Sequence, residues 1–435
     1  MTRAAVCLLL AGFAVPAAGR AAPLEGSAAV ELEYWGQDYF NEIDLPSPVL
    51  VDGVVRETDT TRFAEDAWLP GQRLALRWES DLEDGVRLEL GSRTGFNRER
   101  FQQDLDARAR FGARGGTQWS LRGTGALREE SRSFVGHGDW SVGLEAGRID
   151  PLSGATALET RVSVEHARTR GDTTSFLYDF DRIDARVSVS GGRAWFPDWE
   201  AVLGASRKSV ASEDGGSYGE LTADVSWNAG RRRDTRLTLD ARLRDYDAGG
   251  EVGRDFAEVT AGGERTVWSR GDHGIGVEAE MSAADYRGSD ELYYDYGQLM
   301  VFAPVRFQGV TWNAEAGPRL SLQRDFEGGE RDYAQWTLRT RVGRTTTGGG
   351  YAQLGLETGY RDYRGGASDV VDLAALSTTL LRSDFWLLDV MVLAEAPLGG
   401  AFFVDVLAST LWEVHPGESE RILVALATLA VGRRF

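Results

Sequence analysis

The last ten residues, LATLAVGRRF at 426–435, alternate apolar side chains with small or polar ones and end on an aromatic ring. Steps of two back from Phe435 pass through Arg433, Val431, Leu429, Ala427, Ala425 and Leu423. Successive side chains of an extended strand point to opposite faces, so this alternation predicts a β-strand with one mainly apolar face.

The same period of two runs through most of the chain. In RLALRWE at 73–79, apolar side chains alternate with charged ones, and RLTLDARLR at 236–244 repeats the pattern. Such segments are about 10 to 14 residues long, which exceeds the usual strand of five or six and suits a tilted strand that crosses a bilayer. No apolar run long enough for a transmembrane helix follows residue 22.

The connections between these segments alternate between short and long. DLED at 81–84 is short, whereas RDYDAGGEVGRDF at 244–256 is long and charged. Aromatic residues gather at strand ends, as in GDWS at 138–141 and ELYYDYG at 291–297, where interfacial girdles lie in membrane barrels. The pattern predicts an all-β fold: a single transmembrane antiparallel up-and-down β-barrel.

The first residues have the composition of a secretory signal peptide. Arg3 precedes an apolar stretch from Ala4 to Val15, and small residues follow. We expect a signal peptide at 1–21 and the barrel at 22–435. The one cysteine, Cys7, lies within the signal peptide, so we expect no disulfide and no thiolate metal site in the mature chain.

With these features, the chain resembles bacterial outer-membrane β-barrel proteins, both porin-like and exopolysaccharide-export types. The resemblance implies a location in the bacterial outer membrane. It also implies that Leu429, Val431 and Phe435 form the C-terminal signal that the barrel-assembly machinery recognises. Outer-membrane lipid and lipopolysaccharide are the expected surroundings. Arg433 departs from the apolar run, and a long side chain near the interface can snorkel.

The strand count is predicted at about 20, within 18–22. Alternation marks 21 segments, whereas single-chain bacterial barrels have an even number of strands. One segment is therefore surplus or missing, and the least regular regions are 369–412 and the N-terminal part. Residues 37–70 form the longest break, which we interpret as a long first outer loop or a luminal insertion; a disordered connection is the alternative.

One face of each strand should line the lumen. Early strands place arginines on this face and later strands place carboxylates there, which predicts a basic wall opposite an acidic wall. The alternative is that the charges pair across neighbouring strands. The predicted pore-lining residues are Arg73, Arg77, Arg87, Arg108, Arg110, Arg122, Glu200, Glu220, Asp224, Glu258, Glu264, Glu278 and Glu280.

Three functions fit such a barrel. The first is a channel for polar or charged solutes through a water-filled lumen. The second is a dedicated export barrel for a secreted polysaccharide, working with a periplasmic export partner. The third is a structural or adhesive barrel whose lumen is plugged. A receptor with a large plug domain is not expected, because the strand pattern begins at about residue 26.

Enzymatic and nucleic-acid-binding functions are not expected. The net charge of −19 disfavours binding to phosphate backbones. Of the four histidines, only His166 has a nearby serine, Ser163, and three residues along a strand place the two side chains on opposite faces. No spacing indicates a metal site or a cofactor.

Overall fold

A computed structural model describes residues 24–435 with interruptions. The omitted ranges are 52–53, 82–85, 113–115, 131–136, 154, 172–178, 194–195, 211–215, 230–233, 248–254, 288–293, 327–330, 365–383 and 417–420. For 37–51, 54–65, 130, 137, 170–171, 193, 196–197 and 421 it describes the backbone only. The predicted signal peptide lies outside the described residues. No helix in the described part is long and apolar enough to cross a membrane.

Every regular element of the described chain is a strand. The first ten are β1 Glu25–Val51, β2 Val54–Asp81, β3 Arg87–Asn97, β4 Arg100–Gly112, β5 Gln118–Glu130, β6 His137–Ser153, β7 Thr156–Gly171, β8 Phe180–Arg193, β9 Phe196–Val210 and β10 Tyr218–Ala229. The others are β11 Thr235–Tyr246, β12 Phe256–Arg270, β13 His273–Tyr286, β14 Tyr296–Phe302, β15 Val305–Gln308, β16 Trp312–Asp325, β17 Tyr333–Thr345, β18 Tyr351–Tyr363, β19 Phe385–Gly399, β20 Phe402–Val414 and β21 Arg421–Arg434.

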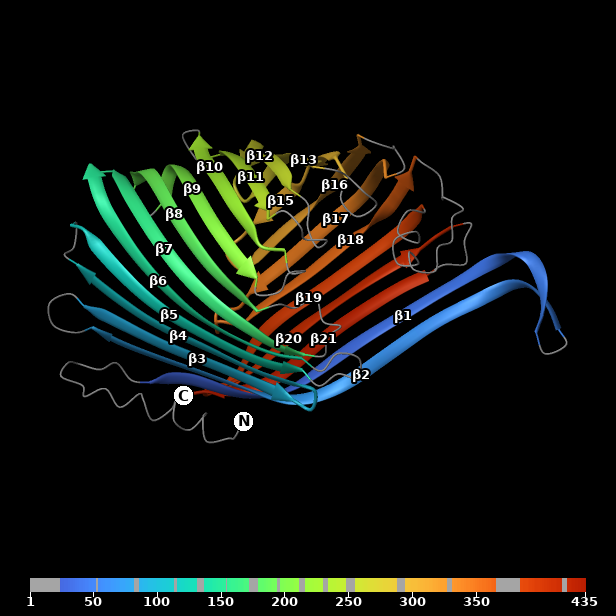
Figure 1. The fold of residues 1–435 in the computed structure, drawn as a ribbon, viewed down its shortest axis with the longest axis horizontal. Coiled ribbons are helices and arrows are strands. Elements are labelled where there is room, and N and C mark those ends of the chain that lie inside the picture. The colour runs from blue at the N-terminus through green and yellow to red at the C-terminus, as the bar shows by residue number, and fades with distance from the viewer. Residues whose placement is uncertain are drawn as a thin grey trace.

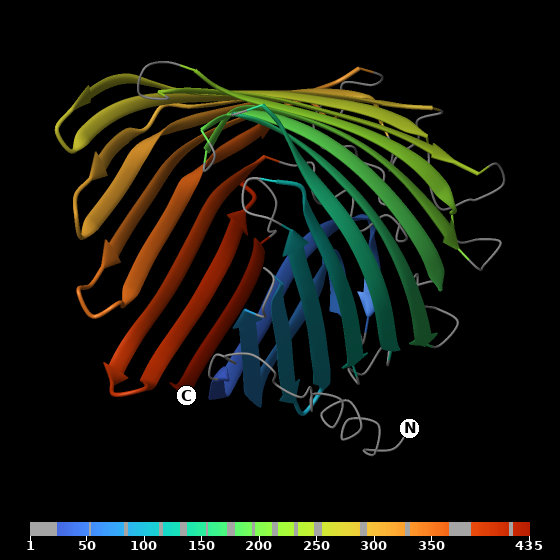
Figure 2. The same cartoon turned by 90° about the vertical axis from the view of Figure 1, so that its left-hand side faces the viewer.

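These strands form one closed antiparallel barrel (Figures 1 and 2). Each strand pairs with the next along the chain, except that β14 and β15 both pair with β13 and β16, and β1 pairs with both β2 and β21, which closes the ring. Figure 2 shows the red C-terminal strands beside the blue N-terminal ones. The chain extends this seam by one residue, because the N–H of Phe435 donates to the Gly26 carbonyl at 2.9 Å and the N–H of Gly26 donates to the Phe435 carbonyl at 2.8 Å.

The barrel has twenty strands, which is the number predicted. The structure divides the chain into 21 elements, but β14 and β15 both lie between β13 and β16 and make up one barrel strand. Residues 369–381, one of the 21 segments that the alternation marks, fall outside the described residues. β18 pairs directly with β19, so no strand stands between them.

The division between β14 and β15 falls at Ala303 and Pro304. Proline has no N–H to donate to a neighbouring strand. Hydrogen bonds nevertheless continue past it, from Gly276 N to Pro304 O at 2.9 Å and from Ala303 N to Pro318 O at 3.1 Å. A side chain at Gly317 would lie 2.3 Å from the Ala303 carbonyl, so glycine there permits the close approach.

For residues 37–70 a loop or luminal insertion was expected, whereas 37–51 and 54–70 are strand. They form the far part of the β1–β2 hairpin, paired from Gln37 with Glu65 to Val51 with Val54. Beyond Phe40 this part pairs with no other strand, and it projects away from the barrel (Figure 1). The backbone of this segment therefore does not enter the barrel.

The outer surface is apolar and carries tryptophans near both ends. Exposed tryptophans next to the short turns are Trp119, Trp199, Trp227, Trp268 and Trp312. Those near the long connections are Trp68, Trp140, Trp336, Trp386 and Trp412. Two such rings around an apolar band are typical of a barrel in a bilayer.

The predicted assembly residues Leu429, Val431 and Phe435 belong to this outer surface and are 44%, 46% and 56% exposed. Their recognition by the assembly machinery stays a prediction.

Candidate functional site

The strand register separates an apolar face from a charged one. Directly opposed residues of an antiparallel pair share a face. Val30 lies opposite Val431, and Trp227 lies opposite Leu237 and Trp199, on the outer face. The neighbouring positions carry most of the charges, on the face that lines the barrel interior. The candidate site is therefore the charged inner wall.

The register places all thirteen predicted pore-lining residues on this inner face. Arg73 and Arg77 lie on the inner face of β2. Because directly opposed residues share a face, the register extends this assignment from each strand to the next around the barrel. The residues concerned are Arg73, Arg77, Arg87, Arg108, Arg110, Arg122, Glu200, Glu220, Asp224, Glu258, Glu264, Glu278 and Glu280.

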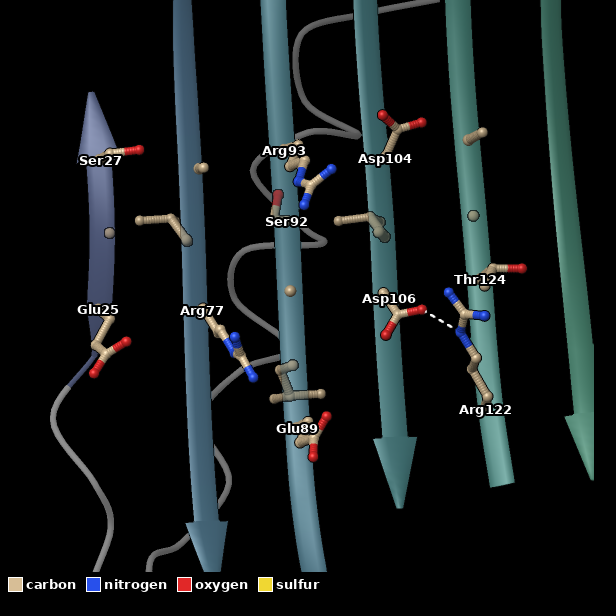
Figure 3. Close-up of a pocket in the computed structure, with 18 of the residues that line it drawn as sticks. Glu25, Ser27, Arg77, Glu89, Ser92, Arg93, Asp104, Asp106, Arg122 and Thr124 are labelled. Atoms are coloured by element: carbon tan, nitrogen blue, oxygen red, sulfur yellow. Dashed lines mark hydrogen bonds and ion pairs between the residues drawn. The ribbon is translucent and has the colours of Figure 1, made fainter. Parts of the chain in front are cut away.

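The early wall is not purely basic. Arg87 contacts Glu79 at 2.5 Å and Glu89 at 3.2 Å, and Arg122 contacts Asp106 at 2.5 Å. Figure 3 shows Arg77, Glu89, Asp106 and Arg122 along β2 to β5 in a cavity of about 1060 Å³, with the Arg122–Asp106 pair marked. The arginines were predicted from the sequence, and the carboxylates between them were not.

Two other arginines of the early wall have different surroundings. Arg73 reaches Asp405 on β20 at 2.9 Å, which links strands on either side of the closing seam. Arg108 lies opposite Arg122, and its Nε is buried with no hydrogen-bond acceptor in the described part of the chain. Most of the predicted basic wall is thus paired locally.

The later wall is likewise mixed. Glu220 is held by Arg244 at 2.5 Å and lies 3.8 Å from Arg242. Arg306 on β15 stands among three carboxylates: Glu264 at 2.7 Å, Glu278 in close contact and Glu315 at 3.7 Å. The guanidinium compensates charges contributed by β12, β13 and β16.

An uncompensated acidic patch remains on this wall. Asp224 lies directly opposite Asp240 in the register, and Glu280 acts electrostatically on the same pair. No basic side chain of the described residues forms an ion pair with these three carboxylates. The predicted contrast between a basic wall and an acidic wall is therefore reduced to a local surplus of negative charge, because pairing across neighbouring strands neutralises most of both walls.

A set of inward-facing aromatic residues at the long-connection end was not predicted from the sequence. Tyr218 and Tyr246 contact each other with ring centroids 5.3 Å apart, and Tyr333 and Tyr363 do so at 5.6 Å. Strand-end aromatics were expected in an outer girdle, and the tryptophans do lie there. These tyrosines occupy the alternate strand positions and face the barrel interior. The repeated Arg-Asp-Tyr at 244–246, 331–333 and 361–363 is the signal that marks them.

The serine and histidine considered for catalysis point to different faces. The Ser163 hydroxyl donates to Asp184 at 3.3 Å on the inner face, whereas His166 contacts Asp181 at 2.6 Å on the outer face. The described residues hold no group of three or more metal-ligating side chains.

Comparison with known proteins supports the fold. No family model and no curated protein matches the chain. Among solved structures, the alcaligin outer-membrane receptor FauA of Bordetella pertussis has a TM-score of 0.52 and 8% identity, covering 92% of this chain and 76% of its own. The FrpB iron transporter of Neisseria meningitidis gives 0.52 and 10%, with 96% and 82% covered. The chain has the fold of the bacterial outer-membrane β-barrels.

OccK5 (OpdH) of Pseudomonas aeruginosa is a more distant match, with a TM-score of 0.47 and 9% identity, covering 94% of this chain and 98% of its own. The fold assignment rests on the two matches above 0.5 together with the closed ring of strands. At these identities the likeness concerns the fold and leaves the solute to be argued from the residues of this chain.

Proposed function

We propose that this barrel is an outer-membrane channel that passes polar or charged solutes, and that the thirteen inner-face residues line its pore. The observation that carries the proposal is the exposure of the inner charges. Arg73, Arg77, Arg87, Arg110 and Arg122 are between 43% and 62% exposed although they face the inside of a closed barrel. A lumen filled by side chains would bury them, whereas a water-filled one keeps them solvated.

The position of residues 37–70 also supports an open channel. A plug would have to lie within the barrel, and the far part of the β1–β2 hairpin projects outside it (Figure 1).

The test is single-channel conductance of the refolded protein in a planar bilayer. We expect steady conductance steps and a reversal potential set by the pore charges, because charged rings in a pore select ions by sign. Arg122→Gln should shift selectivity towards cations. Arg265→Gln removes the same charge from the outer face and should leave selectivity unchanged.

A correctly folded barrel that conducts no ions would contradict the channel and favour an exporter that opens only with a periplasmic partner, or a structural barrel. Equal shifts in Arg122→Gln and Arg265→Gln would contradict the assignment of the pore-lining face.

A further inference from the structure

Two arginines at the long-connection end of the inner face have matching aromatic neighbours. The guanidinium of Arg244 on β11 lies 4.2 Å from the ring centroid of Tyr218, 5.9 Å from that of Tyr246 and 5.1 Å from that of Phe256. Its Nη1 also donates to the Tyr246 hydroxyl at 3.2 Å. Three rings and a hydroxyl hold this cation in one orientation.

Arg361 on β18 repeats the arrangement. Its guanidinium lies 4.3 Å from the ring centroid of Tyr333, 5.8 Å from that of Tyr363 and 4.9 Å from that of Phe385. Its Nη1 donates to the Tyr363 hydroxyl at 3.1 Å. In both cases the rings come from the arginine's own strand and the two neighbouring strands.

The two sites differ at one position. The residue opposite Arg244 on the preceding strand is Glu220, which accepts from Nε at 2.8 Å and from Nη2 at 2.5 Å. The residue opposite Arg361 is Gln335, which accepts from Nε at 2.7 Å. A carboxylate neutralises the first guanidinium, whereas an amide leaves the second with its full charge.

No carboxylate of the described residues forms an ion pair with Arg361, and no acceptor there binds its Nη2. Glu413 on β20 acts on Arg361 electrostatically but does not form an ion pair with it. The rings and Gln335 fix the guanidinium and limit its hydration, so its remaining donors are preorganised for an anion from the lumen.

We propose that Arg361 is a binding site for a carboxylate group at the long-connection end of the lumen. A singly charged carboxylate matches the single positive charge of this guanidinium, and the charge of Glu413 disfavours a dianion. The carboxylate can belong to a small solute or to an acidic polysaccharide. The proposal rests on the channel function for access through the lumen, and it names the solute class that this channel would favour.

The test is calorimetric titration of the full chain, refolded in detergent, with sodium glucuronate and with glucose as the neutral control. We expect glucuronate to bind and glucose not to bind. Arg361→Gln should weaken glucuronate binding by about tenfold or more, because a charge-assisted contact is lost. Gln335→Glu should weaken it comparably, because the new carboxylate would occupy the guanidinium.

The Arg244 site supplies the matched controls. Arg244→Gln should leave glucuronate binding within about twofold of the unchanged chain. Glu220→Gln should create a second site of similar affinity, visible as a doubled stoichiometry. Heat-dependent gel mobility confirms that each variant is a folded barrel. Equal losses of glucuronate affinity in Arg361→Gln and Arg244→Gln would overturn the proposal, and so would an unchanged glucuronate affinity in Arg361→Gln.

Two further arms identify the carboxylate's source and separate this proposal from the channel function. Tighter binding of oligogalacturonate than of glucuronate would indicate an acidic polymer, and equal affinity would indicate a small solute; both support a carboxylate site. Because the titration does not require ion conduction, a silent barrel that binds glucuronate would contradict the channel alone. A conducting barrel that binds neither ligand would contradict the Arg361 site alone.

Discussion

At the scale of the residue, a few glycines decide how closely two strands can approach. A side chain at Gly359 on β18 would meet the Trp336 carbonyl at 2.0 Å and the Thr337 Cα at 2.6 Å, both backbone atoms that cannot move aside freely. We expect Gly359→Ala to lower the free energy of unfolding by about 1–3 kcal/mol. Urea unfolding of the refolded barrel in vesicles measures this. Gly123→Ala, with open space around it, should be nearly neutral.

Arg306 forms ion pairs with three carboxylates. Without it, Glu264 and Glu278 would lose their ion-pair partner, and among the described residues Glu315 would keep only Arg341 at 3.4 Å. Arg306→Gln should cost roughly 1–3 kcal/mol in the same unfolding experiment, since the carboxylates keep partial contact with water. Arg77→Gln removes a 62% exposed guanidinium and should cost less than about 1 kcal/mol. Equal costs for both variants would contradict the bridging role of Arg306.

At the scale of the element, the β1–β2 hairpin has two parts with different roles. Near the termini it closes the barrel, through β1 with β21 and β2 with β3. Beyond Phe40 it pairs only with itself. Replacing residues 42–60 by an Asn-Gly turn should therefore leave the barrel folded and its conductance unchanged, because such a turn closes a two-residue hairpin. Circular dichroism and bilayer recordings check this. Loss of folding would show that the projecting part stabilises the barrel.

At the scale of the whole molecule, two surfaces face two different solvents. Neighbouring residues of β10 test this: Val225 is 45% exposed on the outer face, and Ser226 faces inward opposite Glu200. Val225→Arg should lower the free energy of unfolding in lipid vesicles by roughly 2–4 kcal/mol, the cost of a cation near the bilayer centre. Ser226→Arg should be tolerated, because water and Glu200 receive the charge. A larger loss of unfolding free energy in Ser226→Arg than in Val225→Arg would contradict this assignment of the inner and outer faces.

The alternation of side chains was sufficient to predict much of this architecture. Because the side-chain period of a strand is two, Leu74, Leu76 and Trp78 of RLALRWE assign the face of their charged neighbours without knowledge of the partner strand. This is why each predicted pore-lining residue shares the inner face in the structure. The strand number of about 20 followed from the same pattern, together with the requirement for an even count.

Contacts between distant segments could not be predicted in this way. Arg73 and Asp405 are 332 residues apart in sequence and meet because the barrel closes between β1 and β21. The carboxylates Glu79, Glu89 and Asp106 were overlooked, and they turn the predicted basic wall into a mixed one. The inward aromatic set was missed because tyrosine at a strand end suits either face.

The sequence by itself determined the all-β class, the length of the strands and the separation of an apolar from a charged face, since these depend on local periodicity. The tertiary structure alone decided which charges neutralise each other and where residues 37–70 lie. It also decided that, of Arg244 and Arg361, only Arg244 has a carboxylate partner among the described residues. Those outcomes depend on register: the residue across from Arg244 is Glu220, and the residue across from Arg361 is Gln335. Register is a property of paired strands and arises only when the barrel closes.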